Sequence, residues 1–234
     1  MPLDSSIAEH HEVQSAAKSV LAGLASKISA SDTEQSIAEI AYRELCALGF
    51  PETWYYKCPA FVLSGSRSCL SISGREYVPN SEAIGQLNLV TVDLSPMRND
   101  RWGDCARSFY IEGGQVVVEP AAPELASGKQ FLQVLHTEMQ NTVYPEMKFQ
   151  ELYDWANERI RINGFENLDF LGNIGHSIAT RREDRQYIEA QNIRQLKAVP
   201  FFTFEPHVRE VGGKWGFKHE NIFYFNQDGR IEKL

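Results

Sequence analysis

The chain has 234 residues, of which 43% are hydrophobic and 23% are charged, the usual balance of a globular protein with a sizeable core. Its net charge of −8 argues against a nucleic-acid-binding protein, because contact with phosphates needs a basic surface. No long apolar run is present and the first residues lack the pattern of a secretory signal, so we expect a cytoplasmic protein that does not enter the membrane.

The first half of the chain is predicted to begin with two helices. Apolar residues recur at helical spacing from Ala17 to Leu24, and a polar run that ends at Glu34 supplies capping groups for a second helix that reaches Leu45. Residues 54–73 have the aromatic and β-branched composition of strands and a loop. Three further stretches are predicted to form strands: residues 88–93, 106–111 and, with a weaker pattern, 115–119.

The second half repeats this order. Helices are predicted over residues 124–142 and 149–163, and Gly164 is suited to end the second of them. Residues 172–189 show neither the helical nor the strand period in their apolar residues. The end of the chain has the composition of strands again, over residues 201–205 and 215–225, followed by a turn at 226–229. The order helix, helix, strands occurs twice, which predicts one α+β domain over residues 1–234 with internal pseudo-two-fold symmetry.

Four carboxylates and one histidine lie at the ends of these apolar segments. Asp93 ends one strand, Asp104 begins the next, His176 lies in a glycine-rich segment, and Glu205 and Glu220 adjoin the last strands. Burying an ionised carboxylate is costly unless a cation or hydrogen-bond donors compensate the charge. The residues alone leave two readings open, a site for divalent metal ions and a set of unrelated turn and surface acids.

The order and spacing of these five residues resemble the pita-bread metallopeptidase superfamily, which contains methionine aminopeptidase, aminopeptidase P, prolidase and creatinase. The resemblance covers residues 15–230. It implies a pita-bread fold in which two divalent metal ions are bound by Asp93, Asp104, His176, Glu205 and Glu220, with Glu205 also acting as the general base. A ligand set rich in oxygen suits Mn²⁺, Fe²⁺ or Co²⁺.

Two positions in this chain depart from the pattern of the peptidases that it resembles. Where those enzymes have histidines that stabilise the oxyanion, this chain has Glu76 and Glu183. An ionised carboxylate only accepts hydrogen bonds, so it cannot take over that role. We expect both glutamates to line the substrate pocket as catalytic groups and to favour cationic substrates, unless they are solvated surface residues. His207 is the better candidate for a replacement imidazole, whereas His219 should point away from Glu220.

The resemblance implies a dinuclear-metal hydrolase that cleaves an amide-type C–N bond in a small or amino-terminal substrate, such as a short peptide. The replaced histidines favour an alternative, a metalloenzyme of the same fold that performs oxidative or lyase chemistry on a small amino-acid-like molecule, with a di-iron centre as one form. A third reading is a binding module without turnover. Each of these three functions is compatible with a homodimer.

Overall fold

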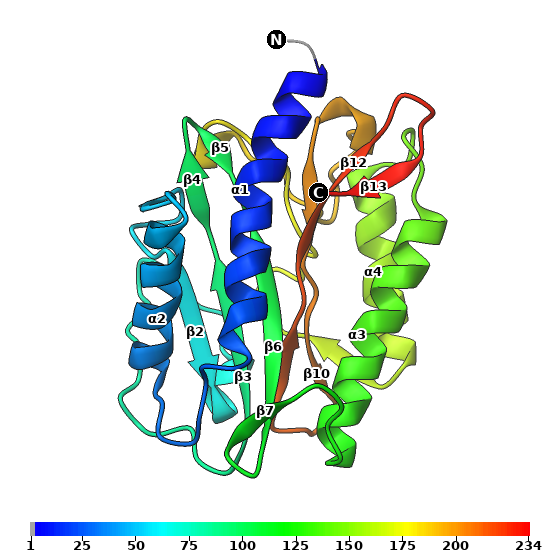
Figure 1. Cartoon of the computed structure of the whole chain (residues 1–234). Helices are drawn as coiled ribbons and strands as arrows, with labels where there is room; N and C mark the ends of the chain where they lie inside the picture. Colours follow the sequence, from blue (N-terminus) through cyan, green and yellow to red (C-terminus); the bar gives the residue numbers. More distant parts are fainter. Residues whose placement is uncertain (1–2) are drawn as a thin grey trace.

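The computed structural model describes residues 3–234, with side chains described from residue 6 onward. Its elements form two halves with the same order, two helices followed by strands, and every β-ladder is antiparallel. In Figure 1 the helices of the first half lie on the left and in the centre, the helices of the second half lie on the right, and the strands lie between and behind them. The pseudo-symmetric α+β fold predicted from the sequence is therefore confirmed.

The first half begins with helices α1 (Leu3–Leu24) and α2 (Glu34–Ala47). Thr33 caps α2, because its side chain accepts a hydrogen bond from the Ser36 backbone N–H. The main sheet has the order β2–β3–β6–β7, and its strands are β2 (Ala60–Ser64), β3 (Leu87–Leu94), β6 (Cys105–Glu112) and β7 (Gln115–Val117). A short 3₁₀ helix and a small sheet complete this half: η1 (Gly65–Cys69), β1 (Glu52–Thr53), β4 (Pro96–Arg98) and β5 (Arg101–Trp102).

The second half begins with helices α3 (Pro123–Thr142) and α4 (Phe149–Ile162). Two three-stranded sheets follow, with the orders β11–β10–β8 and β13–β12–β9. Their strands are β8 (Phe165–Asn167), β9 (Phe202–Phe204), β10 (His207–Glu210), β11 (Gly216–Lys218), β12 (Asn221–Phe225) and β13 (Ile231–Lys233). Two 3₁₀ turns lie between β8 and β9: η2 (Arg182–Asp184) and η3 (Leu196–Ala198).

The strand composition predicted over residues 215–225 corresponds to two separate strands in the structure. The segment forms β11 and β12, which belong to different sheets and are separated by His219 and Glu220. At the break, the Glu220 backbone N–H donates to the Ala106 carbonyl of β6, 3.0 Å away. The chain leaves one sheet of the second half, contacts the first half, and then enters the other sheet.

Each half has a hydrophobic core of its own. In the first half, α1 and α2 pack on the main sheet through residues such as Leu24, Ile37 and Val92. In the second half, α3 and α4 pack on the strands through residues such as Leu135 and Phe204. The halves join where β11 passes β6, and there the Lys218 N–H donates to the Ser108 hydroxyl at 2.9 Å. The ends of β3 and β6 therefore lie against the strands of the second half.

None of the helices that the structure describes is both long enough and apolar enough to cross a membrane.

Candidate metal centre

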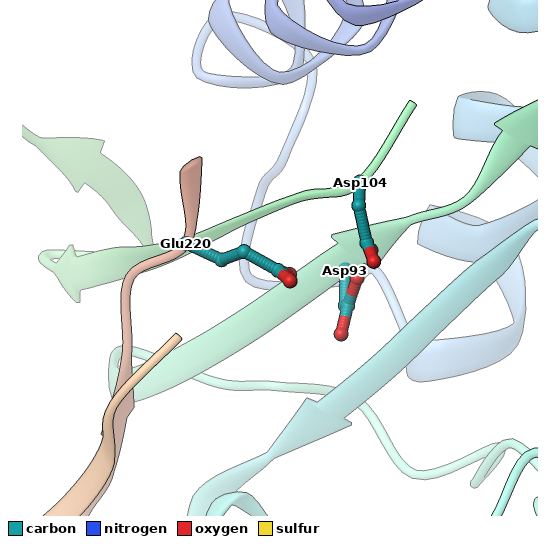
Figure 2. A group of neighbouring side chains, drawn as sticks. All are labelled: Asp93, Asp104 and Glu220. Atoms are coloured by element: carbon teal, nitrogen blue, oxygen red, sulfur yellow. The ribbon is translucent and has the colours of Figure 1, made fainter. Parts of the chain in front are cut away.

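Three carboxylates meet where the two halves join. Asp93 lies near the end of β3, Asp104 directly precedes β6, and Glu220 connects β11 to β12. One carboxylate oxygen from each lies within 4.8 Å of the other two. Figure 2 shows the three side chains pointing toward one another from three separate segments of the chain. Three negative groups at this distance repel one another strongly unless a cation or protons compensate their charge.

The buried oxygens of this group lack hydrogen-bond donors. Asp104 Oδ2 and both carboxylate oxygens of Glu220 are buried, and no donor contacts them within the part of the chain that the structure describes. Glu34 is as deeply buried as Glu220 and provides a contrast. Its oxygens accept from the backbone N–H groups of Ser64 and Asn80, and it forms a salt bridge with Arg67. Glu34 is a satisfied structural carboxylate, whereas Asp104 and Glu220 have the open coordination that a metal ion requires.

Electrostatics leads to the same conclusion. Burial, followed by the charges of Asp93 and Glu205, raises the pKa of Asp104 well above its ordinary value. Burial, followed by the charges of Asp104 and Glu205, has the same effect on the pKa of Glu220. Without a cation, each of these two carboxyl groups keeps its proton to a higher pH than an ordinary carboxyl group does. A divalent ion would replace those protons and restore the ionised form.

His176 and Glu205 border the same group. His176 Nε2 lies 3.4 Å from Asp104 Oδ2 and 3.6 Å from Glu205 Oε1. Burial is the main cause that lowers the pKa of His176 to about 4. The imidazole is therefore neutral at physiological pH, and a neutral imidazole is the form that binds metal ions.

Backbone hydrogen bonds hold the glycine-rich segment against β9. Thr203 exchanges bonds with His176, since its N–H donates to the His176 carbonyl at 2.7 Å and its hydroxyl accepts from the His176 N–H at 3.0 Å. The Glu205 N–H donates to the Ile174 carbonyl at 2.8 Å. Gly175 has φ +150°, and a Cβ atom there would lie 2.4 Å from the Thr203 carbonyl oxygen. Only glycine allows this close approach, which places His176 beside Glu205.

Lys218 is a member of the site that the sequence did not reveal. Its buried ammonium lies 2.6 Å from Asp93 Oδ2 and 3.3 Å from Glu205 Oε2. Burial alone would lower the pKa of Lys218, but the charges of Asp93 and Glu205 raise it well above its ordinary value. Burial likewise opposes ionisation of Glu205, but the pKa of Glu205 is lowered, and the positive charge of Lys218 is the largest cause of this lowering. No signal in the sequence marks Lys218, because its contacts with Asp93 and Glu205 join segments that are distant along the chain.

Gln14 of α1 holds the backbone of Asp104 and was also missed. Its amide nitrogen donates to the Asp104 carbonyl at 2.8 Å, and its amide oxygen accepts from the Asp104 N–H at 2.8 Å. The side chain of Gln14 is fully buried. A buried glutamine in an otherwise apolar helix face needs such partners, so its position in the pattern was a usable signal.

Asp93 and Asp104 of the acidic group line a cavity of about 430 Å³, together with His176 and Glu205. His207 lines this cavity, as expected, and its Nε2 is 2.6 Å from the Ser68 carbonyl oxygen. His219 points away from it, also as expected, and packs against the His136 ring at a centroid distance of 4.4 Å. The cavity is also lined by aromatic and cationic side chains: Trp54, Tyr55, Tyr56, Phe61, Phe170, Tyr187, Arg185 and Lys218.

The structure does not bring Glu76 or Glu183 to the cavity. Both side chains are exposed, and neither is among the lining residues. Glu183 lies in η2 and pairs at 3.9 Å with the exposed Arg181. Glu76 lies in a turn, where its own N–H donates to the Ser73 carbonyl. The neighbouring residues that line the cavity are Ser71, Ile72 and Ser73. The expected pocket lined by these two glutamates is not formed.

Solved structures with the same fold include several peptidases. The chain matches an X-Pro aminopeptidase from Thermotoga maritima with a TM-score of 0.81 at 17% identity, covering 98% of this chain and 60% of that chain. An Xaa-Pro dipeptidase from Bacillus anthracis gives the same four values. A prolidase from Thermococcus sibiricus matches with a TM-score of 0.79 at 16% identity, covering 98% of this chain and 58% of that chain. The chain thus spans about three fifths of the length of these proteins, and at such identities the likeness shows the fold.

In sequence, no curated protein matches the chain. A family model does match, over residues 8–227, and it describes metallopeptidase family M24. This match covers nearly all of the chain, both halves included, and confirms the resemblance drawn from the spacing of the acidic residues. The chain belongs to metallopeptidase family M24 and has its pita-bread fold.

Proposed function

We propose that this chain is a metal-dependent hydrolase that cleaves an amide-type C–N bond in a short peptide or another small substrate. One observation supports this more than any other. The buried oxygens of Asp104 and Glu220 have no donor within the described chain, and Asp104 lines a cavity of about 430 Å³. A cavity of this size accommodates a small ligand. Structural relatives of this chain include an aminopeptidase and a dipeptidase, which agrees with such a substrate.

The residues present fit two divalent metal ions. Asp93, Asp104, His176, Glu205 and Glu220 would hold them, and this oxygen-rich set suits Mn²⁺, Fe²⁺ or Co²⁺. When bound, such ions supply Lewis acidity, which polarises a substrate carbonyl and acidifies a water molecule.

Glu205 is suited to hold and move a proton. Burial opposes its ionisation, but its pKa is lowered, mainly by the positive charge of Lys218, so the carboxylate is ionised at neutral pH. It can accept a proton from the attacking water and return it to the nitrogen that leaves. Lys218, at 3.3 Å, fixes the orientation of this carboxylate.

Few imidazole or cationic groups line the cavity as donors for an oxyanion. The second imidazole of the wall belongs to His207, and its Nε2 is engaged with the Ser68 carbonyl. The cationic donors that line the cavity are Lys218 and Arg185. Loss of one oxyanion donor lowers an acyl-transfer rate by about 10²–10³. We therefore expect slow hydrolysis of Met-Xaa and Xaa-Pro peptides.

The proposal is tested by removing all metal and restoring Mn²⁺, Co²⁺ or, without oxygen, Fe²⁺. Dipeptides are incubated with each form, and the released amino acids are measured by mass spectrometry. We expect slow cleavage with at least one metal, none in the metal-free form, and none in Asp104→Asn. The proposal fails if no metal form cleaves any amide or peptide of a broad mixture.

The second candidate is a dimetal enzyme that is not a peptidase. It is favoured by the scarcity of free imidazoles, because His176 and His207 are the histidines found among the cavity-lining residues. Iron-loaded protein that takes up O₂ in the presence of small amino-acid-like molecules, without peptide cleavage, would support this candidate over the hydrolase.

A further inference from the structure

The cavity wall contains a tyrosine whose hydroxyl group accepts a hydrogen bond but donates none. Tyr55 follows β1 in the chain and lines the cavity. Its oxygen accepts from the Gly74 N–H at 3.2 Å, and its O–H group has no acceptor among the residues that the structure describes. A hydroxyl group away from bulk water ordinarily uses its donor as well as its acceptor sites. The proton of Tyr55 is therefore available to a ligand in the cavity.

Several contacts hold the ring of Tyr55 in one position. Its centroid lies 5.2 Å from the Trp54 ring and 5.0 Å from the Tyr56 ring, at interplanar angles of 61° and 60°. The Tyr55 N–H donates to Thr53 Oγ1 at 3.1 Å, which fixes the backbone. A Cβ atom at Gly74 would lie 2.6 Å from Tyr55 Cε1, so the missing side chain lets the backbone approach the ring. The hydroxyl group is thus positioned before a ligand binds.

Tyr55 lies close to the candidate metal centre. Its ring packs on Trp54, and the Trp54 ring lies 5.7 Å from the His176 ring, edge to face. Burial is the main cause that raises the pKa of Tyr55, so the hydroxyl group is protonated at neutral pH. The charges of Lys218 and Asp93 also act on this pKa, in opposite directions. The phenol is therefore a neutral donor within electrostatic reach of the metal centre.

Other tyrosines of the same region lack this combination. The Tyr77 oxygen accepts from the Val62 N–H at 3.1 Å, and its O–H donates to the Val62 carbonyl at 2.9 Å. Tyr77 is a satisfied structural residue and is not among those that line the cavity. Tyr56 and Tyr187 do line it, but no hydrogen bond within the described chain fixes their hydroxyl groups. Tyr55 alone of the four is both held by a backbone N–H and left with a free donor.

We propose that the Tyr55 hydroxyl group donates a hydrogen bond to the oxyanion that develops on the carbonyl oxygen of the substrate. This assignment rests on the proposed function, because it names a donor for the reaction of that site. Two other donors of the wall are engaged elsewhere, His207 with the Ser68 carbonyl and Lys218 with Asp93. A hydroxyl group that accepts from a backbone N–H donates a stronger hydrogen bond in turn. Tyr55 keeps its proton, and the bond strengthens as negative charge grows on the substrate oxygen.

The experiment compares two ligands that differ at the position of the reacting carbonyl. One is the phosphinic analogue of alanylalanine, whose tetrahedral P–O⁻ group imitates the oxyanion. The other is the reduced-amide analogue, in which a CH₂ group replaces the carbonyl and accepts no hydrogen bond. Binding is measured by calorimetry on the full chain loaded with Mn²⁺, and elemental analysis checks that each variant holds the same amount of metal.

The test variant is Tyr55→Phe, which removes only the hydroxyl group. The matched control is Tyr77→Phe, which makes the same change at a tyrosine outside the cavity. We expect Tyr55→Phe to bind the phosphinic analogue about 10–100-fold more weakly, as for the loss of a hydrogen bond to a charged group, and the reduced amide equally well. Its kcat on a dipeptide should fall by about 10²–10³ with little change in KM, because the bond forms in the transition state. Tyr77→Phe should lower the melting temperature and leave binding of both ligands unchanged.

Equal affinity for the phosphinic analogue in the unmodified protein and in folded Tyr55→Phe would overturn the assignment. So would a Mn²⁺-loaded protein that does not bind this analogue, or an equal loss of affinity for both ligands in Tyr55→Phe. Binding of the phosphinic analogue that depends on Tyr55, without cleavage of any amide, would remove the proposed function and leave the donor in place. Cleavage that proceeds unchanged in Tyr55→Phe would retain the proposed function and reject Tyr55 as the donor.

Discussion

Two glutamates in this protein are equally buried and differ in what surrounds them. Glu34 accepts hydrogen bonds from backbone donors and pairs with Arg67, whereas the Glu220 oxygens have no donor in the described structure. A carboxylate whose charge is fully satisfied contributes to the stability of the fold. A group of carboxylates that lacks donors reduces stability until a cation binds.

This contrast predicts opposite results for two similar substitutions. Asp104→Asn should remove most of the bound metal, measured by elemental analysis, without lowering the melting temperature of the metal-free protein, because the buried carboxyl group is replaced by a neutral one of the same shape. Glu34→Gln should retain the metal and lower the free energy of unfolding by about 2–3 kcal/mol, because it weakens hydrogen bonds to a charged group. If Asp104→Asn keeps its full metal content, Asp104 is not a ligand.

The spacing of acidic residues and the family resemblance were sufficient to select five residues that the structure brings together. They were not sufficient to find Lys218 or Arg185. A lysine beside a metal site looks like any surface lysine in a sequence, and its role depends on contacts between segments that are distant in the chain. The direction of Glu76 and Glu183 could not be predicted either, because the path of a loop decides which of its residues face the cavity.

At the scale of helices and strands, long periodic segments were predictable and short ones were not. The four long helices and the strands β3 and β6 lie where the pattern of apolar residues placed them. Strands of two to four residues, such as β4 and β10, are too short to show a period. The break between β11 and β12 was hidden for another reason. Phe217 and Ile222, on either side of the break, are both apolar and buried, although they belong to different sheets.

The contact of α3 with the strands of the second half predicts a pH dependence. His136 of α3 lies against Phe204 of β9, and its Nε2 is 3.0 Å from the His219 carbonyl oxygen. Burial lowers the pKa of His136 to about 3. In the unfolded chain an imidazole has a pKa of about 6.5, so the unfolded state binds one more proton between these values. Stability is therefore lost as the pH falls from 6.5 toward 3.

Urea unfolding at pH 7 and at pH 5 measures this effect. In His136→Gln the loss of unfolding free energy between the two pH values should be smaller than in the unmodified protein by about 2 kcal/mol. His11 is exposed, so His11→Gln is the matched control and should leave the loss unchanged. An identical loss in His136→Gln would show that other groups determine the acid sensitivity.

At the scale of the whole molecule, the candidate metal centre connects the two halves. Asp93 and Asp104 come from the first half, whereas His176, Glu205 and Glu220 come from the second. Ions bound to both sets would stabilise the contact between two separate cores. We therefore predict that the chain unfolds as one domain, in a single cooperative transition, when metal is bound.

Removing the metal should lower the melting temperature. A ligand present at a hundred times its dissociation constant stabilises a protein by about 2.7 kcal/mol. For a chain of this size, that corresponds to a shift of about 5–10 °C. Differential scanning calorimetry with and without a chelator measures the shift, and Asp104→Asn should show none. A melting temperature that is unaffected by chelation in the unmodified protein would contradict this prediction.

The division of the five residues between the halves also has a consequence for biosynthesis. During translation Asp93 and Asp104 leave the ribosome about a hundred residues before Glu220 does. A nascent or truncated chain therefore holds two acidic residues without their partners, which makes a weak site for any cation. Full metal affinity appears only once the last strands have been made and have folded back onto the first half. Tight metal binding would then occur only after the chain has been synthesised beyond Glu220 and has folded. A fragment that ends before Glu220 could not compete for the cell's supply of metal.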